Sequence, residues 1–181
     1  IRCNHNFFLL NNFNNFRMGI FSFLKNAGAK LFGHKEAEKP ATNAGTTAPN
    51  ADVAAMVERQ KEEMLANLVN SMNLDISNLS VDLQGDTAVI FGDANTQADK
   101  EKAILTIGNV GGIAHVDDRM NVLNVEPEAK FYEVQKGDSL SKIAKHFYGD
   151  AMKYTRIFEA NQPMLKSPDL IYPGQMLRIP A

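Results

Sequence analysis

The sequence has few of the residues that would place it in several common classes of protein. Its one cysteine, Cys3, has no partner within the chain, so there is neither a disulfide framework nor a cysteine metal site. This agrees with a reducing compartment. Tryptophan is absent, so one of the aromatic side chains on which sugar rings often stack is missing.

The chain also lacks an excess of charge of either sign. Its 19 basic and 21 acidic residues give a formal net charge of −2 and a pI near 6.1, without the clustered basic face that nucleic acid requires. No hydrophobic run approaches the roughly 20 residues that span a bilayer. With 44% hydrophobic and 22% charged residues, the composition is typical of a soluble globular protein with one ordinary domain or two small ones.

The first residues show no export signal. Residues 1–17 carry a short apolar patch that asparagines interrupt, and no small-residue cleavage pattern follows. We expect residues 1–17 to be upstream sequence or a poorly structured tail. The missing signal predicts a cytoplasmic protein.

An apolar stripe begins after residue 17. Its members recur at helical spacing and predict an amphipathic helix over residues 18–33: Ile20, Phe23, Leu24, Ala27 and Leu31. We expect this helix to dock on the following domain. The alternative is a membrane-surface anchor, but Lys25 and Lys30 are fewer than the basic clusters that hold anionic lipid. Residues 34–51 have the composition of a flexible linker.

Residues 52–125 predict a first small domain. Asp52 is suited to cap a long helix whose buried side is expected to be Val53, Met56, Val57, Met64, Leu65, Leu68 and Val69. Two strands joined at a Gly-Asp turn predict a β-hairpin, and a helix over 96–107 precedes the glycine-rich segment GNVGG and a further alternating strand. The predicted order is α-β-β-α-β.

A second small domain is predicted for residues 131–181, after a polar hinge at 126–130. A strand containing Tyr132 and Val134 is followed by a turn at Gly137 and a helix that Asp138 or Ser139 caps. A second helix and a Pro-Gly turn lead into a final strand, giving the order β-α-α-β. The fold class is therefore α+β, with two small domains and an N-terminal amphipathic helix.

Both predicted domains resemble known families. The stretch VDLQGDTAVIFGDANTQADKEKAILTIGNVGGIAHVDDRMNV resembles a BON domain, a family linked to phospholipid or periplasmic association. Residues 131–180 resemble a LysM domain, a family that usually holds bacterial wall polysaccharide. The joining of the two after the segment MGIFSFLKNAGAKLFG resembles a family of small cytoplasmic potassium-binding proteins. The linker before Asp52 is longer than in that family.

The resemblance implies that a potassium ion is the ligand and that main-chain oxygens hold it. Carried over by position, these oxygens belong to Leu24 and Ala27 in the first segment and to Gly108, Val110 and Ile113 in the second. The residues themselves leave two interpretations of GNVGG open, because helix C-caps commonly use glycine and the last helical carbonyls are also free to bind a cation. We expect a monomer that acts as a potassium sensor or buffer.

An alternative is a peptidoglycan- or membrane-associated binding module. The LysM resemblance implies a saccharide groove between the loops at 136–140 and 161–175, where Gly137, Asp138, Ser139 and Tyr172 would contact sugar. The absence of an export signal and of tryptophan weakens this hypothesis.

Other sites receive little support from the sequence. Asp117 and Asp118 do not have the spacing of a calcium loop and are expected to be solvated, as are Asp82 and Asp86. The four histidines are too scattered for a zinc site. Ser139, Ser141 and His146 are close in sequence but have no nucleophile-elbow motif, so we do not expect an enzyme.

Overall fold

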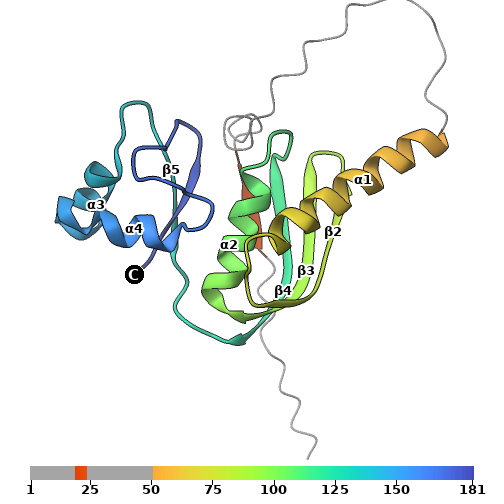
Figure 1. Cartoon of the computed structure of the whole chain (residues 1–181), viewed down its shortest axis with the longest axis horizontal. Helices are drawn as coiled ribbons and strands as arrows, with labels where there is room; N and C mark the ends of the chain where they lie inside the picture. Colours follow the sequence, from red (N-terminus) through yellow and green to blue (C-terminus); the bar gives the residue numbers. More distant parts are fainter. Residues whose placement is uncertain (1–18, 24–50) are drawn as a thin grey trace, which may run out of the picture.

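The computed structural model describes residues 19–23 and 51–181, which form two adjacent α+β units (Figure 1). The first unit contains the strand β1 (Gly19–Ser22), the helix α1 (Ala51–Asn70), the strands β2 (Ile76–Gln84) and β3 (Thr87–Thr96), the helix α2 (Gln97–Gly108) and the strand β4 (His115–Asn124). The predicted α-β-β-α-β order is present, with β1 added in front.

The four strands of the first unit form one sheet in the order β1-β4-β3-β2. β2 and β3 form an antiparallel hairpin that turns at Gly85, which has a φ of 68°. β3 and β4 are parallel because α2 carries the chain from one to the other, and β1 pairs antiparallel with the outer edge of β4. Both helices pack on one face of this sheet (Figure 1), where Leu65, Ile90 and Ile104 lie in the core.

The second unit is built on a two-stranded antiparallel sheet. β5 (Lys130–Glu133) pairs with β6 (Met176–Ile179), and the helices α3 (Leu140–Tyr148) and α4 (Tyr154–Ala160) lie between them in sequence, separated by the 3-10 turn η2 (Ala151–Lys153). The Ser139 hydroxyl caps α3 by accepting from the Lys142 N–H, and Gly149 ends that helix in the left-handed conformation. The predicted β-α-α-β order is present.

The predicted helix over 18–33 is wrong for its first residues. Gly19–Ser22 form a strand, and Phe21 and Phe23 pack against the core while Ile20 is 72% exposed. The spacing of Ile20 and Phe23 fitted a helix, but backbone pairing with β4 makes every second side chain face the core. Residues 24–33, like the predicted tail at 1–17 and the linker before Ala51, lie outside the described residues.

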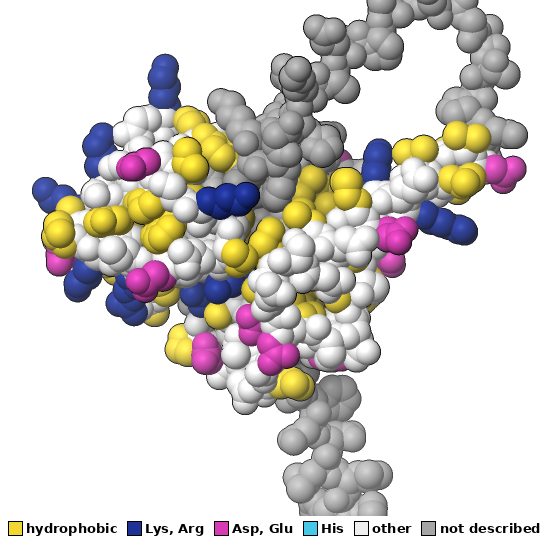
Figure 2. Space-filling view, viewed as in Figure 1, with side chains coloured by type: hydrophobic (Ala, Val, Ile, Leu, Met, Phe, Trp, Pro, Cys, Tyr) yellow, Lys and Arg dark blue, Asp and Glu magenta, His cyan; other side chains and the backbone are white. Residues whose placement is uncertain are grey.

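The predicted buried side of α1 is correct only from Leu65 onward, where Leu68 is half-buried. Leu65 and Val69 are buried, whereas Val53, Met56, Val57 and Met64 are exposed. The beginning of α1 extends past the sheet, and no other described element lies beneath it (Figure 1), so its apolar side chains are exposed (Figure 2). None of the described helices is both long enough and apolar enough to span a bilayer.

Candidate functional site

The segment GNVGG forms a helix end followed by a tight turn. The Asn109 N–H donates to the Leu105 carbonyl at 3.0 Å and the Val110 N–H to the Ile107 carbonyl at 3.0 Å, which ends α2. The Ile113 N–H then donates to the Val110 carbonyl at 3.2 Å, and Gly112 adopts a φ of 100° that favours glycine. The segment is therefore a cap and a turn, as one of its two interpretations predicted.

This geometry also leaves carbonyl oxygens available at the end of α2. Among the described residues, neither the Gly108 nor the Ile113 carbonyl accepts a backbone hydrogen bond, and the Val110 carbonyl has a second lone pair. The C-terminal end of a helix carries partial negative charge. Neutral oxygens in such a place can replace the hydration shell of a weakly hydrated monovalent cation.

Phe23 brings the N-terminal segment directly against this helix end. A Cβ atom added at Gly108 would lie only 2.1–2.3 Å from atoms of the Phe23 ring, so the ring rests on the bare Cα of Gly108. The Phe23 N–H donates to the Ala114 carbonyl at 2.8 Å, one residue beyond the turn. The residue before Leu24 is therefore held beside the predicted ligand loop. Leu24 and Ala27 themselves lie outside the described residues.

The N-terminal strand also contacts the second unit. The Phe21 ring meets the Phe131 ring edge to face at a centroid distance of 5.2 Å. Phe23 packs against both hydrophobic cores. The N-terminal segment at residues 19–23 therefore lies where the predicted ligand loop, the first unit and the second unit meet.

Sequence reasoning missed the face of α2 that holds the second unit. Glu101, Leu105 and Asn109 are spaced by four residues and form one stripe along the helix. Leu105 is 1% exposed and belongs to the core of the second unit, although it lies in the first. The four-residue spacing was visible in the sequence, but a stripe of one acid, one leucine and one amide does not resemble a core-facing pattern.

A buried ion pair ties the two units together at the start of this stripe. The Arg178 Nε atom donates to Glu101 Oε2 at 2.6 Å, and Glu101 Oε1 accepts from Gln97 Nε2 and from the Ala129 N–H. Glu101 is 2% exposed, so its charge depends on these donors. The predicted hinge at 126–130 is thus bound to α2 through Ala129.

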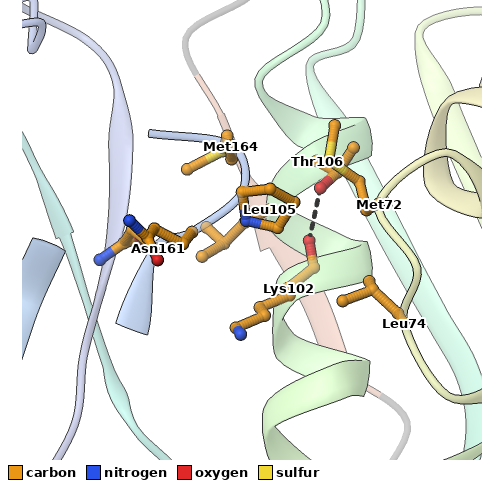
Figure 3. A pocket seen from close by; sticks show the side chains of 9 residues that line it. Met72, Leu74, Lys102, Leu105, Thr106, Asn161 and Met164 are labelled. Atoms are coloured by element: carbon orange, nitrogen blue, oxygen red, sulfur yellow. Dashed lines mark hydrogen bonds between the residues drawn. The ribbon is translucent and has the colours of Figure 1, made fainter. Parts of the chain in front are cut away.

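The junction beside the stripe is closely packed. Figure 3 shows Asn161 and Met164 from the second unit approaching Leu105, with Met72 and Leu74 beyond it and the Thr106 hydroxyl donating to the Lys102 carbonyl at 2.8 Å. The crevice that these side chains line has a volume of about 10 Å³, room for about one water molecule. It is too small to be a binding site for an organic ligand.

The residues predicted for sugar binding are only partly brought together. Asp138 and Ser139 line a polar groove of about 400 Å³ together with Ser141, Tyr154 and Asp169. The Asp138 carboxylate accepts hydrogen bonds from the Tyr132 hydroxyl and the Gln135 N–H. The hydrogen bond from Tyr132 to Asp138 raises the pKa of Tyr132.

Gly137 and Tyr172 do not line this groove. Burial raises the pKa of Tyr172 above its usual range, and its hydroxyl is a buried atom without a hydrogen-bond partner among the described residues. Tyr172 is therefore half-buried, with its hydroxyl closed off from solvent.

The acidic residues form no cation site in the described ranges. Asp117 and Asp118 point to opposite faces of the sheet: Asp117 binds Arg119 on the outer face, and Asp118 is 3% exposed and pairs with Lys100 at 2.8 Å. The expectation that both are solvated is therefore wrong for Asp118, because α2 covers that side of β4. Across residues 19–23 and 51–181, no three His, Cys, Asp or Glu side chains cluster as a metal site would require.

Comparison with known proteins agrees with the two-unit architecture. The BON domain family matches residues 57–124 and the LysM domain family matches residues 132–180. The first unit is a BON domain and the second a LysM domain, in the order that the sequence predicted.

Curated relatives match this chain over different shares of its length. The potassium binding protein Kbp of Escherichia coli O6:H1 is 37% identical over 167 residues, which cover 90% of this chain and 99% of Kbp. An uncharacterized protein of Deinococcus radiodurans is 34% identical over 70% of this chain and 56% of its own length. An uncharacterized protein of Bacillus subtilis, YqbP, is 40% identical over 60 residues. The chain therefore belongs to the family of BON–LysM proteins that includes the potassium binding protein Kbp.

Proposed function

We propose that this protein binds a potassium ion through main-chain oxygens and serves as a cytoplasmic potassium sensor or buffer, a binding protein rather than an enzyme. The observation that carries the proposal is the seating of Phe23 on Gly108, because it holds the N-terminal segment against the free carbonyls at the end of α2. The name of the E. coli relative supports potassium as the ion.

The proposed ligands are the carbonyl oxygens of Leu24, Ala27, Gly108, Val110 and Ile113. Two segments far apart in the sequence contribute them, so the ion has its full set of ligands only when both segments are in place. Binding should therefore stabilise the folded, compact state. At a hundredfold excess over the dissociation constant, a ligand of the native state alone adds about 2.7 kcal/mol of stability.

The test is a potassium titration of the whole chain at constant ionic strength, with sodium as the matched control. We expect potassium to raise the unfolding midpoint, to shift the backbone amide signals of residues 108–113, and to reduce the radius of gyration in small-angle scattering. Equal responses to the two ions would show ordinary screening of charge and would contradict the proposal.

A second candidate function is saccharide binding, and the polar groove at Asp138 and Ser139 favours it. In this function the protein would be a peptidoglycan- or membrane-associated module. N-acetylglucosamine oligomers should then shift the amide signals of residues 136–140 and 161–175 in a saturable way. If potassium binding is the function of the chain, these signals should stay unchanged while those of residues 108–113 respond to the ion.

A further inference from the structure

The strand β6 has one edge that none of the other strands at residues 19–23 and 51–181 covers. β5 pairs with β6 in the register Tyr132 to Leu177 and Lys130 to Ile179. Alternate residues of an antiparallel strand direct their N–H and C=O groups to opposite edges. Met176 and Arg178 therefore present theirs to the edge away from β5.

Two asparagine side chains cover this edge in the same way. Asn161, the residue after α4, accepts from the Arg178 N–H at 2.8 Å and donates to the Arg178 carbonyl at 2.8 Å. Asn109, the residue after α2, accepts from the Met176 N–H at 2.9 Å and donates to the Met176 carbonyl at 3.1 Å. Each amide thus replaces one residue of a missing partner strand.

The likeness extends to the helices that carry the two amides. Asn161 Nδ2 donates to the Ile157 carbonyl and Asn109 Nδ2 to the Leu105 carbonyl, in each case one turn back in its own helix. Both side chains are buried, at 2% and 1% exposed. The two asparagines differ in the domain to which they belong. Asn161 is part of the LysM domain, whereas Asn109 is part of the BON domain and binds β6 across the junction.

Asn109 also lies between two proposed ligands, Gly108 and Val110. A side chain bonded at both ends to β6 restricts the rotation of the peptide groups on either side of it. We infer that Asn109 is a positioning residue of the ion site and that the β6 edge of the LysM domain sets the direction of the loop carbonyls. This inference rests on the proposed function and gives the LysM domain a part in ion selectivity.

The test compares Asn109→Ala with Asn161→Ala in the full-length chain. Asn109→Ala should raise the potassium dissociation constant about tenfold, since it removes hydrogen bonds at a buried site. It should also narrow the preference for potassium over sodium, because loosely held carbonyls adapt to the smaller ion. Asn161→Ala removes the same bonds from the same strand, and should lower stability while leaving the ratio of the two affinities unchanged.

A variant on the LysM side protects the test against misfolding of Asn109→Ala. Met176→Pro removes the N–H that Asn109 accepts and leaves the loop sequence intact; proline is tolerated at the first residue of a strand. Like Asn109→Ala, it should reduce the preference for potassium over sodium. In the unmodified protein, potassium should also shift the amide signal of Met176.

The outcomes separate this inference from the proposed function. If the unmodified protein does not bind potassium, both are overturned. If it binds potassium and Asn109→Ala or Met176→Pro retains the same affinity and the same ratio, the positioning role is overturned and the proposed function stands.

Discussion

At Gly108, glycine is required because a larger side chain would clash with the Phe23 ring. Gly108 is helical and has no unusual φ, so its need for glycine comes from the Phe23 ring that occupies the place of a Cβ atom. We expect Gly108→Ala to lower the free energy of unfolding by about 1–3 kcal/mol, the usual cost of overpacking. Urea denaturation measures this difference.

A double-mutant cycle tests whether the Phe23 ring causes this loss of stability. In the Phe23→Ala background the ring is absent. Gly108→Ala should then change the free energy of unfolding little or even raise it, because alanine has a higher helix propensity than glycine. An equal cost of Gly108→Ala in both backgrounds would contradict the steric explanation.

The element α1 offers a comparison between its two halves. Met56 is 61% exposed on the part that extends past the sheet, whereas Leu65 is 2% exposed above it. Met56→Ala should change the stability by less than about 0.5 kcal/mol, and Leu65→Ala should cost about 2–5 kcal/mol. Thermal or urea unfolding of the two variants measures the difference. A comparable loss from Met56→Ala would mean that this face is covered in solution.

The elements also show what the sequence could predict. Alternation identified the strand at residues 79–83, because its side chains face the core and the solvent in turn. Ser139 and Gly149 could be recognised as helix ends from local chemistry. The strand β1 could not be recognised. Ile20 in the strand and Phe23 just after it match a helix as well as a strand. The pairing with β4 that decides between the two depends on a distant part of the chain.

The candidate site follows the same division between local and distant information. The turn at GNVGG was predictable, because glycine preferences act over a few residues and Gly112 has a φ of 100°. The contact of Phe23 with Gly108 and the pairing of Asn109 with Met176 were not, since each joins segments from different elements. The ligand assignment to Leu24 and Ala27 stays a prediction.

At the scale of the whole molecule, the two domains should unfold together. Leu105 belongs by sequence to the BON domain and by packing to the LysM core, and Glu101 and Arg178 form a buried pair across the junction. Leu105→Ala should cost about 2–5 kcal/mol and divide one transition into two.

The chain provides a selective probe for each half of that experiment. All four tyrosines lie in the LysM domain and tryptophan is absent, so intrinsic fluorescence reports on that domain alone. The amide signal of Ile90, in the core of the BON domain, reports on the other. We expect the two probes to report the same unfolding transition in the unmodified protein and two separate transitions in Leu105→Ala. Separate transitions in the unmodified protein would show that the domains unfold independently.

The place of β1 in the sheet has a consequence for the order of events during synthesis. The ribosome makes Gly19–Ser22 early, but their partners in β4 come after most of the BON domain has been made. Phe21 and Phe23 therefore have no core to pack against until α1, the hairpin and α2 have been synthesised. Phe21 can contact Phe131 only after synthesis of the LysM domain has begun. Contacts that close so long a stretch of chain form slowly. β1 is thus translated before the other described elements and is among the last of them to pair, and until then Phe21 and Phe23 lack the partners that bury them.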